Sequence, residues 1–280
     1  MKYLSPPTYD DLQIFRALST HPRAKIHPLL GQNLGPIGAA YQHYKNSGGN
    51  PHLLHSPLLL DDDLKENMQK IYEKKIEVLK YIDEIRNKLS PDVCPMCGSY
   101  GNGQVDHIIP KTIYPEFSFF SHNLIPACSC NQTKSTNFKG PNGERLLHPY
   151  YDIELRDRIC YLAFSGSVDT PDLDVERVLP YASNQHVKFH IESVVKKSNI
   201  FNWASKEWSK LQTRPNRTRL QRQNESVSRS DIKSMLEREF ISYDEEYGTP
   251  NNWKSMFYYG LALKEDFHEH IRNYVNAAQP

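Results

Sequence analysis

Four of the five cysteines fall in one short stretch of the chain as two close pairs, Cys94/Cys97 and Cys128/Cys130. Paired cysteines at such spacing are typical ligands of a tetrahedral Zn²⁺ ion, and nothing in the sequence indicates secretion, where a disulfide framework is expected. We therefore predict a structural zinc site. The second pair is one residue closer than the common Cys-x-x-Cys, which leaves open whether both of its thiolates bind the same ion. The alternative is two pairs of inert thiols, and the separate Cys160 is interpreted as a core residue.

A second group of polar side chains lies between the cysteine pairs and directly after them. Asp106 and Asn131 offer the hard oxygen ligands that Mg²⁺ prefers, and the imidazole of His107 can take a proton from water near neutral pH. A bound Mg²⁺ or Mn²⁺ would offset charge that develops on a phosphate, and Lys134 would add a contact to the phosphate backbone. Each residue alone has a simpler interpretation, since Asn131 suits a helix cap and Asn123 can brace a turn. The order of the whole string predicts phosphodiester hydrolysis.

In this order the residues resemble the HNH endonuclease family, whose ββα-metal fold is often stapled by zinc. The resemblance implies that His107 is the general base, that Asp106 and Asn131 bind the catalytic metal ion, and that Asn123 orients the loop of the base. The chain departs from the family pattern in its Cys-x-Cys, and Asn131 stands where some members carry His. The pattern C-x-x-C, D-H-x-x-P, N-L, C-x-x-C-N-x-x-K is matched by Cys94/Cys97, Asp106-His107-Ile108-Ile109-Pro110, Asn123-Leu124 and Cys128/Cys130-Asn131 with Lys134.

A narrower resemblance covers mainly residues 91–152, about a fifth of the chain. Residues 114–118, 123–128 and 148–152 are similar to the HNH subunit of Septu-type anti-phage defence systems (the PtuB family), including the versions attached to retrons. This resemblance implies an ABC/SMC-like ATPase partner (PtuA-like) that holds the nuclease in check. For retron-attached versions it also implies a reverse transcriptase with its RNA/DNA product.

A basic cluster between residues 206 and 229 offers candidate contacts to a nucleic acid substrate. Only Glu207 and Glu225 oppose its charge. Arginine suits bidentate phosphate binding, but a solvated helix face and a docking surface for an acidic partner remain open alternatives. The candidate substrate-binding residues are Lys134 and Lys111 near the central motif and Arg214, Arg217, Arg219 and Arg222 in this cluster.

Three regions must position these residues. Residues 1–90 form a helical N-terminal region and candidate partner-docking surface, 91–152 the HNH nuclease core with its zinc knuckles, and 153–280 a mainly helical C-terminal region with the basic segment. The expected fold class is α+β, a mostly helical chain around a zinc-stapled ββα-metal (treble-clef-like) core. We expect one long helix after Asp61, Asp62 and Asp63 that reaches about Leu89. The other expected elements are strands at 105–109, 124–127, 159–164 and 187–191, and helices from near 129 and at 202–212, 230–242 and 251–275.

Composition bounds the function further. Lys plus Arg total 34 against 33 Asp plus Glu, so any binding of nucleic acid must come from local patches. No apolar run approaches the roughly 18 residues of a membrane span, and no secretory signal is apparent at the start. We expect a cytoplasmic protein with no membrane contact.

Two classes of function remain. The first is a metal-dependent HNH endonuclease that cuts nucleic acid, with DNA favoured over tRNA or other RNA, as the effector of an ATPase-controlled anti-phage complex. The second is a catalytically inactive, zinc-stabilised nucleic-acid-binding or adaptor module. The intact set of Asp106, His107, Asn131 and Lys134 favours the first, because neither zinc binding nor folding needs the histidine.

Overall fold

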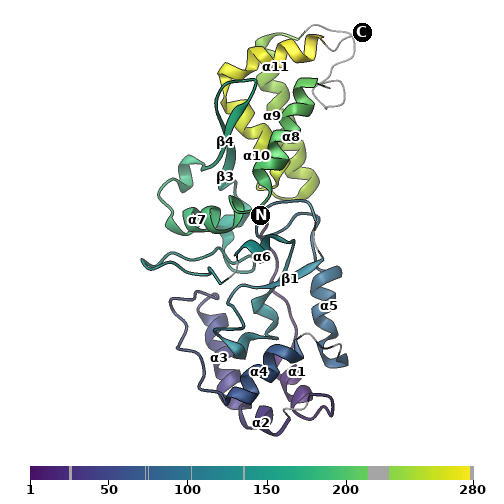
Figure 1. Cartoon of the computed structure of the whole chain (residues 1–280), viewed down its shortest axis with the longest axis vertical. Coiled ribbons are helices and arrows are strands. Elements are labelled where there is room, and N and C mark those ends of the chain that lie inside the picture. Colours follow the sequence, from purple (N-terminus) through teal and green to yellow (C-terminus); the bar gives the residue numbers. More distant parts are fainter. Residues whose placement is uncertain are drawn as a thin grey trace. The chain divides into compact units, whose positions relative to one another are not determined.

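The computed structural model describes residues 1–24, 27–72, 74, 76–101, 103–134, 136–213 and 227–277; the side chains of His27 and Asn131 also lie outside the description. The fold is α+β, with helices and, among the described residues, two small antiparallel sheets (Figure 1). Two compact units divide the chain. The N-terminal unit comprises Tyr3–Pro95 and Gly101–Asp152, and the C-terminal unit comprises Met1–Lys2, Met96–Tyr100 and Ile153–Pro280.

Helices of the N-terminal unit pack around an aromatic core. The face of α3 contributes Tyr41, whose ring stacks on Phe120 at 4.1 Å, and Tyr44, whose ring meets Phe117 edge-on at 5.0 Å. Phe15 of α1 packs against Phe119. The aromatic segment 117–120 is thereby fixed between helices. The helices are α1 (Asp11–Ser19), α2 (His27–Gln32), α3 (Leu34–Asn46), α4 (Asp62–Ile71) and α5 (Lys80–Asn87).

A short β-hairpin followed by a short helix carries the predicted chemistry. Strand β1 (Gln104–His107) pairs antiparallel with β2 (Leu124–Ala127), with Asp106 opposite Ile125 and His107 opposite Leu124. Helix α6 (Cys130–Lys134) starts directly after β2, and α5 packs against both strands. Between the strands the chain forms two single-turn 3-10 helices, η2 (Pro115–Phe117) and η3 (Ser121–Asn123). The strands expected at 105–109 and 124–127 are confirmed, although the first ends at His107.

The C-terminal unit combines the second sheet with four longer helices. Strand β3 (Cys160–Gly166) pairs with β4 (Pro171–Arg177), and α10 (Trp253–Leu263) packs against β3. Trp253 Nε1 donates a hydrogen bond to Cys97 O at 2.8 Å and so holds the segment 96–100 within this unit. The other elements are α7 (Gln185–His190), a π-helical turn η6 (Ile191–Val195), α8 (Ile200–Thr213), α9 (Arg229–Tyr247) and α11 (Glu265–Ala277).

Three secondary-structure predictions were wrong. The long helix expected up to Leu89 is broken into α4 and α5, because Ile76 between them has an extended backbone. Residues 187–191 are helical, since Asn184 caps α7 by accepting from the N–H groups of two residues. The last helix is divided at Lys264, which leaves the helical region with φ −92° and ψ 76°.

The regions expected at 1–90 and 91–152 pack largely into one unit, because α3, α4 and α5 contact the hairpin and its connection. Residues 96–100 belong instead to the C-terminal unit. Among the helices formed by described residues, none is both long enough and apolar enough to cross a bilayer.

The close packing of α10 on β3 gives a test of the C-terminal unit. A Cβ added at Gly260 would lie 1.7 Å from Leu162 O, a backbone atom fixed in the sheet. We expect Gly260→Ala to lower the free energy of unfolding by about 3 kcal/mol, the upper end of overpacking effects. The control is Gly35→Ala in α3, where a Cβ meets nothing within 4 Å and the helix should gain up to about 1 kcal/mol. Equal urea unfolding curves for wild type and Gly260→Ala would contradict the packing.

Candidate metal centre and catalytic site

All four paired cysteines converge. The Sγ atoms of Cys94, Cys97, Cys128 and Cys130 lie within 4.8 Å of one another, and the Cys94 and Cys130 sulfurs are 3.7 Å apart. Two thiolates at 2.3 Å from a tetrahedral Zn²⁺ are separated by about 3.8 Å, so the spacing fits one ion. The short Cys-x-Cys does not prevent convergence, because both Cys128 and Cys130 are in the cluster.

The surroundings of this four-cysteine cluster also suit a structural ion. Cys94, Cys97 and Cys130 are buried, and only Cys128 is partly exposed. The backbone N–H of Cys130 donates to Cys128 Sγ at 3.3 Å, which is a favourable contact for a thiolate. Four thiolate ligands with no oxygen ligand are typical of closed structural sites. The cluster is therefore compatible with a structural zinc ion.

Asp106 and His107 lie at the end of β1 and are both 9% exposed. Lys134, at the end of α6, is only 2% exposed; its Nζ is 3.0 Å from Asp106 Oδ2 and donates to His107 O at 2.8 Å. Burial raises the pKa of Asp106, and the charge of Lys134 opposes that rise. The ion pair thus joins the last turn of α6 to β1. Lys134 was predicted to contact substrate, whereas its ammonium here is directed at the protein.

The imidazole of His107 is held in one orientation. Its Nε2 lies 2.8 Å from Ser118 O, and because a carbonyl can only accept, Nε2 carries the proton and Nδ1 the lone pair. Tyr72 packs edge-on against the ring at 4.6 Å. Burial lowers the pKa of His107 to about 3, so the ring is neutral at pH 7 and Nδ1 carries no proton.

Asn123 braces the connection between the strands. It is fully buried, and its Nδ2 donates to Ile109 O at 2.9 Å and to Phe117 O at 3.2 Å. Its Oδ1 accepts from Ile109 N at 2.8 Å and from Tyr44 Oη at 3.1 Å. Four hydrogen bonds use the whole capacity of the carboxamide. Asn123 therefore positions the loop after His107.

Sequence analysis did not identify the residues that form a hydrogen-bond chain leading from Asn123. The hydroxyl of Tyr44 donates to Asn123, so it accepts from His148 Nε2 at 3.0 Å, and His148 Nδ1 in turn accepts from Tyr150 N at 3.2 Å. His148 N donates to Asp152, which also pairs with Arg145. The only available signal was the string His148–Asp152, because Tyr44 lies 79 residues from its partner and nothing local marks it.

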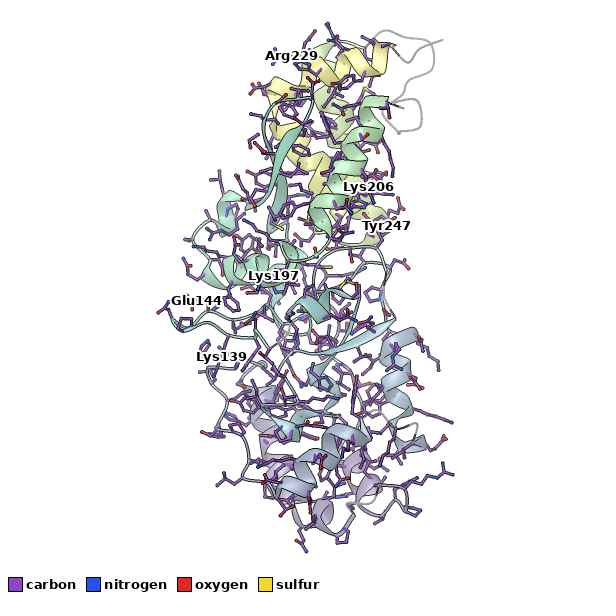
Figure 2. All side chains as sticks on the ribbon, viewed as in Figure 1. Lys139, Glu144, Lys197, Lys206, Arg229 and Tyr247 are labelled. Atoms are coloured by element: carbon purple, nitrogen blue, oxygen red, sulfur yellow. The ribbon has the colours of Figure 1, made fainter. Side chains whose placement is uncertain are left out.

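The remaining candidate residues are dispersed or not described. Lys111 Nζ lies 4.5 Å from the centre of the Tyr72 ring, and the same Tyr72 ring packs against His107. Lys206 and Arg229, at the ends of the basic cluster, lie apart in the C-terminal unit (Figure 2). The side chain of Asn131 and the segment with Arg214, Arg217, Arg219 and Arg222 lie outside the described residues. Their roles stay predictions.

Comparison with known proteins adds one relative. The chain is 28% identical to the protein ea31 of Escherichia phage lambda over 228 residues, which cover 75% of this chain and 76% of the phage protein. The chain is distantly similar to that phage protein. No family model and no solved structure matches the chain. The similarity extends well beyond the hairpin and the cysteines, so it concerns most of the chain.

Removing one cysteine tests whether the four act together. We expect Cys128→Ser to lose bound zinc and to lower the melting temperature, because a structural ion contributes folding free energy directly. Cys160→Ser is the control, since Cys160 is buried outside the cluster and should leave zinc content unchanged. Zinc per chain is measured by mass spectrometry. Full zinc content in Cys128→Ser would exclude it as a ligand.

The buried histidines predict acid sensitivity of the N-terminal unit. Burial lowers the pKa of His148 to about 3 and that of His122 to about 4. The unfolded chain binds protons below about pH 6.5, while the folded chain does so only near pH 3 to 4, so stability falls as pH drops through that window. Each histidine contributes a slope of at most about 1.4 kcal/mol per pH unit.

The measurement is the urea midpoint of unfolding at a pH of about 7.5 and of about 5. His148→Gln should be less stable at the higher pH but lose less stability on acidification than wild type. His270→Gln, which changes an exposed histidine of α11, should follow wild type. Identical acid losses in His148→Gln and wild type would show that His148 is not the group responsible.

Proposed function

We propose that the chain is a metal-dependent HNH endonuclease that hydrolyses phosphodiester bonds in nucleic acid. The observation that carries the proposal is the oriented His107 at the end of β1, next to Asp106 and backed by Asn123. It is followed by β2 and α6 in the order of a ββα-metal motif. The four-cysteine cluster includes residues just before and after this hairpin, as a stapling zinc would require.

In the proposed reaction, His107 Nδ1 takes the proton of a water molecule, whose oxygen attacks the phosphorus. The P–O bond to the departing sugar oxygen breaks, and that oxygen takes a proton from a second water molecule and leaves as a hydroxyl. His107 then releases its proton to the hydroxide that remains, which restores the neutral imidazole. Asn123 holds the loop so that Nε2 stays bonded to Ser118 O and Nδ1 stays available. A divalent Mg²⁺ or Mn²⁺ held by Asp106 and Asn131 would supply charge stabilisation for the phosphate and the leaving oxygen.

Lys134 sets a condition on this proposal. Its ammonium already neutralises Asp106, so a metal ion at the same carboxylate must share or displace that contact. Phosphate is the natural alternative partner for a displaced lysine. Lys134 would then pass from Asp106 to substrate as the metal ion binds, which gives it the substrate contact expected from the sequence.

The biological setting is proposed from the resemblance alone. We infer that the nuclease is the effector of an anti-phage defence complex, controlled by an ABC/SMC-like ATPase and acting on DNA in preference to RNA. One observation favours the second candidate, an inactive binding or adaptor module: His107 and Lys134 are largely buried in the isolated chain. A partner that opens the site would reconcile that burial with activity.

His107→Ala tests the reaction directly. The purified chain is incubated with plasmid DNA and with total tRNA in Mg²⁺ or Mn²⁺, alone and with any ATPase that co-purifies. Wild type should cut one of these substrates, and His107→Ala should lose at least about 100-fold in rate, the usual contribution of a general base. His270→Ala is the matched control on α11.

Zinc content and cooperative unfolding should be retained in both variants, so that loss of cutting reports chemistry, although His107→Ala removes a buried hydrogen bond and should melt at a lower temperature. Cutting by His107→Ala at the wild-type rate would remove this residue from the mechanism. Silence of every sample, including those with the co-purifying ATPase, would favour the adaptor module.

A further inference from the structure

A small apolar cavity lies within the N-terminal unit, away from the four cysteines. It has a volume of about 250 Å³ and is formed by one side of α3, the segment 54–58 and the turn η2. Its walls are mainly apolar, with Ala39 and Ala40 on α3, Leu58 on the connecting segment and Phe117 on the turn. This volume is just below the roughly 300–1,000 Å³ of small-molecule sites, so it suits a single ring system.

One strongly polar group lines this apolar cavity. Glu116 is 2% exposed; its Oε1 accepts from Leu58 N at 3.0 Å, while its Oε2 has no hydrogen-bond partner among the described residues. A buried oxygen without a donor costs free energy that a ligand could recover. Burial raises the pKa of Glu116, as expected for a carboxyl group in apolar surroundings.

Two flat rings add an aromatic surface to the cavity. His43 and His55 both line it, and their rings stack with centres 4.0 Å apart and planes inclined by 20°. His43 Nε2 donates to Leu53 O at 2.8 Å, which fixes that ring, and His55 is exposed. The two rings cover each other's inner faces, so they offer aromatic lining beside which a planar base can pack.

We propose that this cavity receives one unpaired nucleobase of the substrate, which donates an N–H to Glu116 Oε2 and packs between apolar walls beside the two histidines. The inference rests on the proposed nuclease function, since it names the substrate class as nucleic acid with an unstacked base. A phosphate would be repelled by Glu116, and an apolar protein side chain would leave Oε2 without a donor. The edge of a nucleobase carries no negative charge and presents N–H groups, so it avoids the repulsion and gives Oε2 a hydrogen-bond donor.

The cavity shares a turn with the candidate catalytic site. Phe117 lines the cavity, and its carbonyl accepts from Asn123; the next carbonyl, that of Ser118, accepts from His107. A base that packs on Phe117 therefore contacts the segment that orients the general base. Recognition of an unpaired base and positioning of His107 would depend on the same few residues.

The test compares binding of two DNA duplexes that differ in one base. One duplex carries a single bulged guanine, and the other carries an abasic residue at the same position. The protein is the full zinc-loaded chain with His107→Ala, so that no cleavage occurs, and binding is followed by fluorescence anisotropy. We expect the bulged base to bind about tenfold more tightly than the abasic duplex, within the range for stacking one base.

Three further variants locate that preference. Glu116→Gln replaces the acceptor Oε2 by a donor group, and Ala39→Leu fills the cavity; both should abolish the tenfold preference. Gln42→Leu is the control, because Gln42 lies on the same helix but does not line the cavity. Equal binding of the two duplexes, or a preference retained in both Glu116→Gln and Ala39→Leu, would overturn the proposal.

The outcomes separate this inference from the proposed function. Cutting by wild type, together with equal binding of the two duplexes, would overturn the base site and leave the nuclease intact. A base preference that depends on Glu116, in a chain that never cuts, would support the site and contradict the nuclease. Loss of binding of a protein partner in Ala39→Leu, with DNA binding unchanged, would assign the cavity to that partner and overturn the proposal.

Discussion

The candidate site depends on one buried carboxamide. The connection from Ile108 to Asn123 leaves the two-stranded sheet, so its backbone groups cannot be paired by a ladder and must find other partners. Turn hydrogen bonds pair many of them, and the Asn123 side chain adds donors to two carbonyls and an acceptor for Ile109 N. Because an isolated two-stranded hairpin is marginally stable, this internal bracing and the helices around it decide whether His107 has a fixed orientation.

The second constraint is electrostatic. Asp106 and Lys134 form a nearly buried ion pair, and such a pair contributes little net stability because both groups lose their hydration. Removal of one partner is costly, however, since it leaves the other charge buried and uncompensated. Replacement of one charged partner by another of the same sign therefore costs less free energy than removal of that partner. A divalent ion at Asp106 and a phosphate at Lys134 would be such an exchange, with the net charge of the site kept close to balance.

Local patterns predicted the parts of the site that are close in sequence. The strand positions around Asp106 and Leu124 and the start of α6 follow from short apolar runs and turn residues. The cysteine spacing predicted a zinc site but left open whether Cys128 and Cys130 bind the same ion, and the structure brings all four sulfurs together. The bracing by Tyr44 and His148 could not be predicted, because a hydrogen bond across 79 or 104 residues leaves no periodic mark. The breaks after Ile71 and at Lys264 were missed for a related reason: apolar spacing continues across both, and only the backbone changes.

The turn 116–118 contacts both the proposed base-binding cavity and the imidazole of His107. Glu116 and Phe117 line a cavity, the Phe117 carbonyl accepts from Asn123, and the Ser118 carbonyl fixes the proton on His107 Nε2. If the proposals hold, a ligand that orders this turn would lower the cost of holding the imidazole in one orientation, and it would give Glu116 Oε2 the donor that it lacks among the described residues. A nuclease of this design would be most active where a base is already unpaired. It would spare intact duplex, since extrusion of a paired base costs a few kcal/mol.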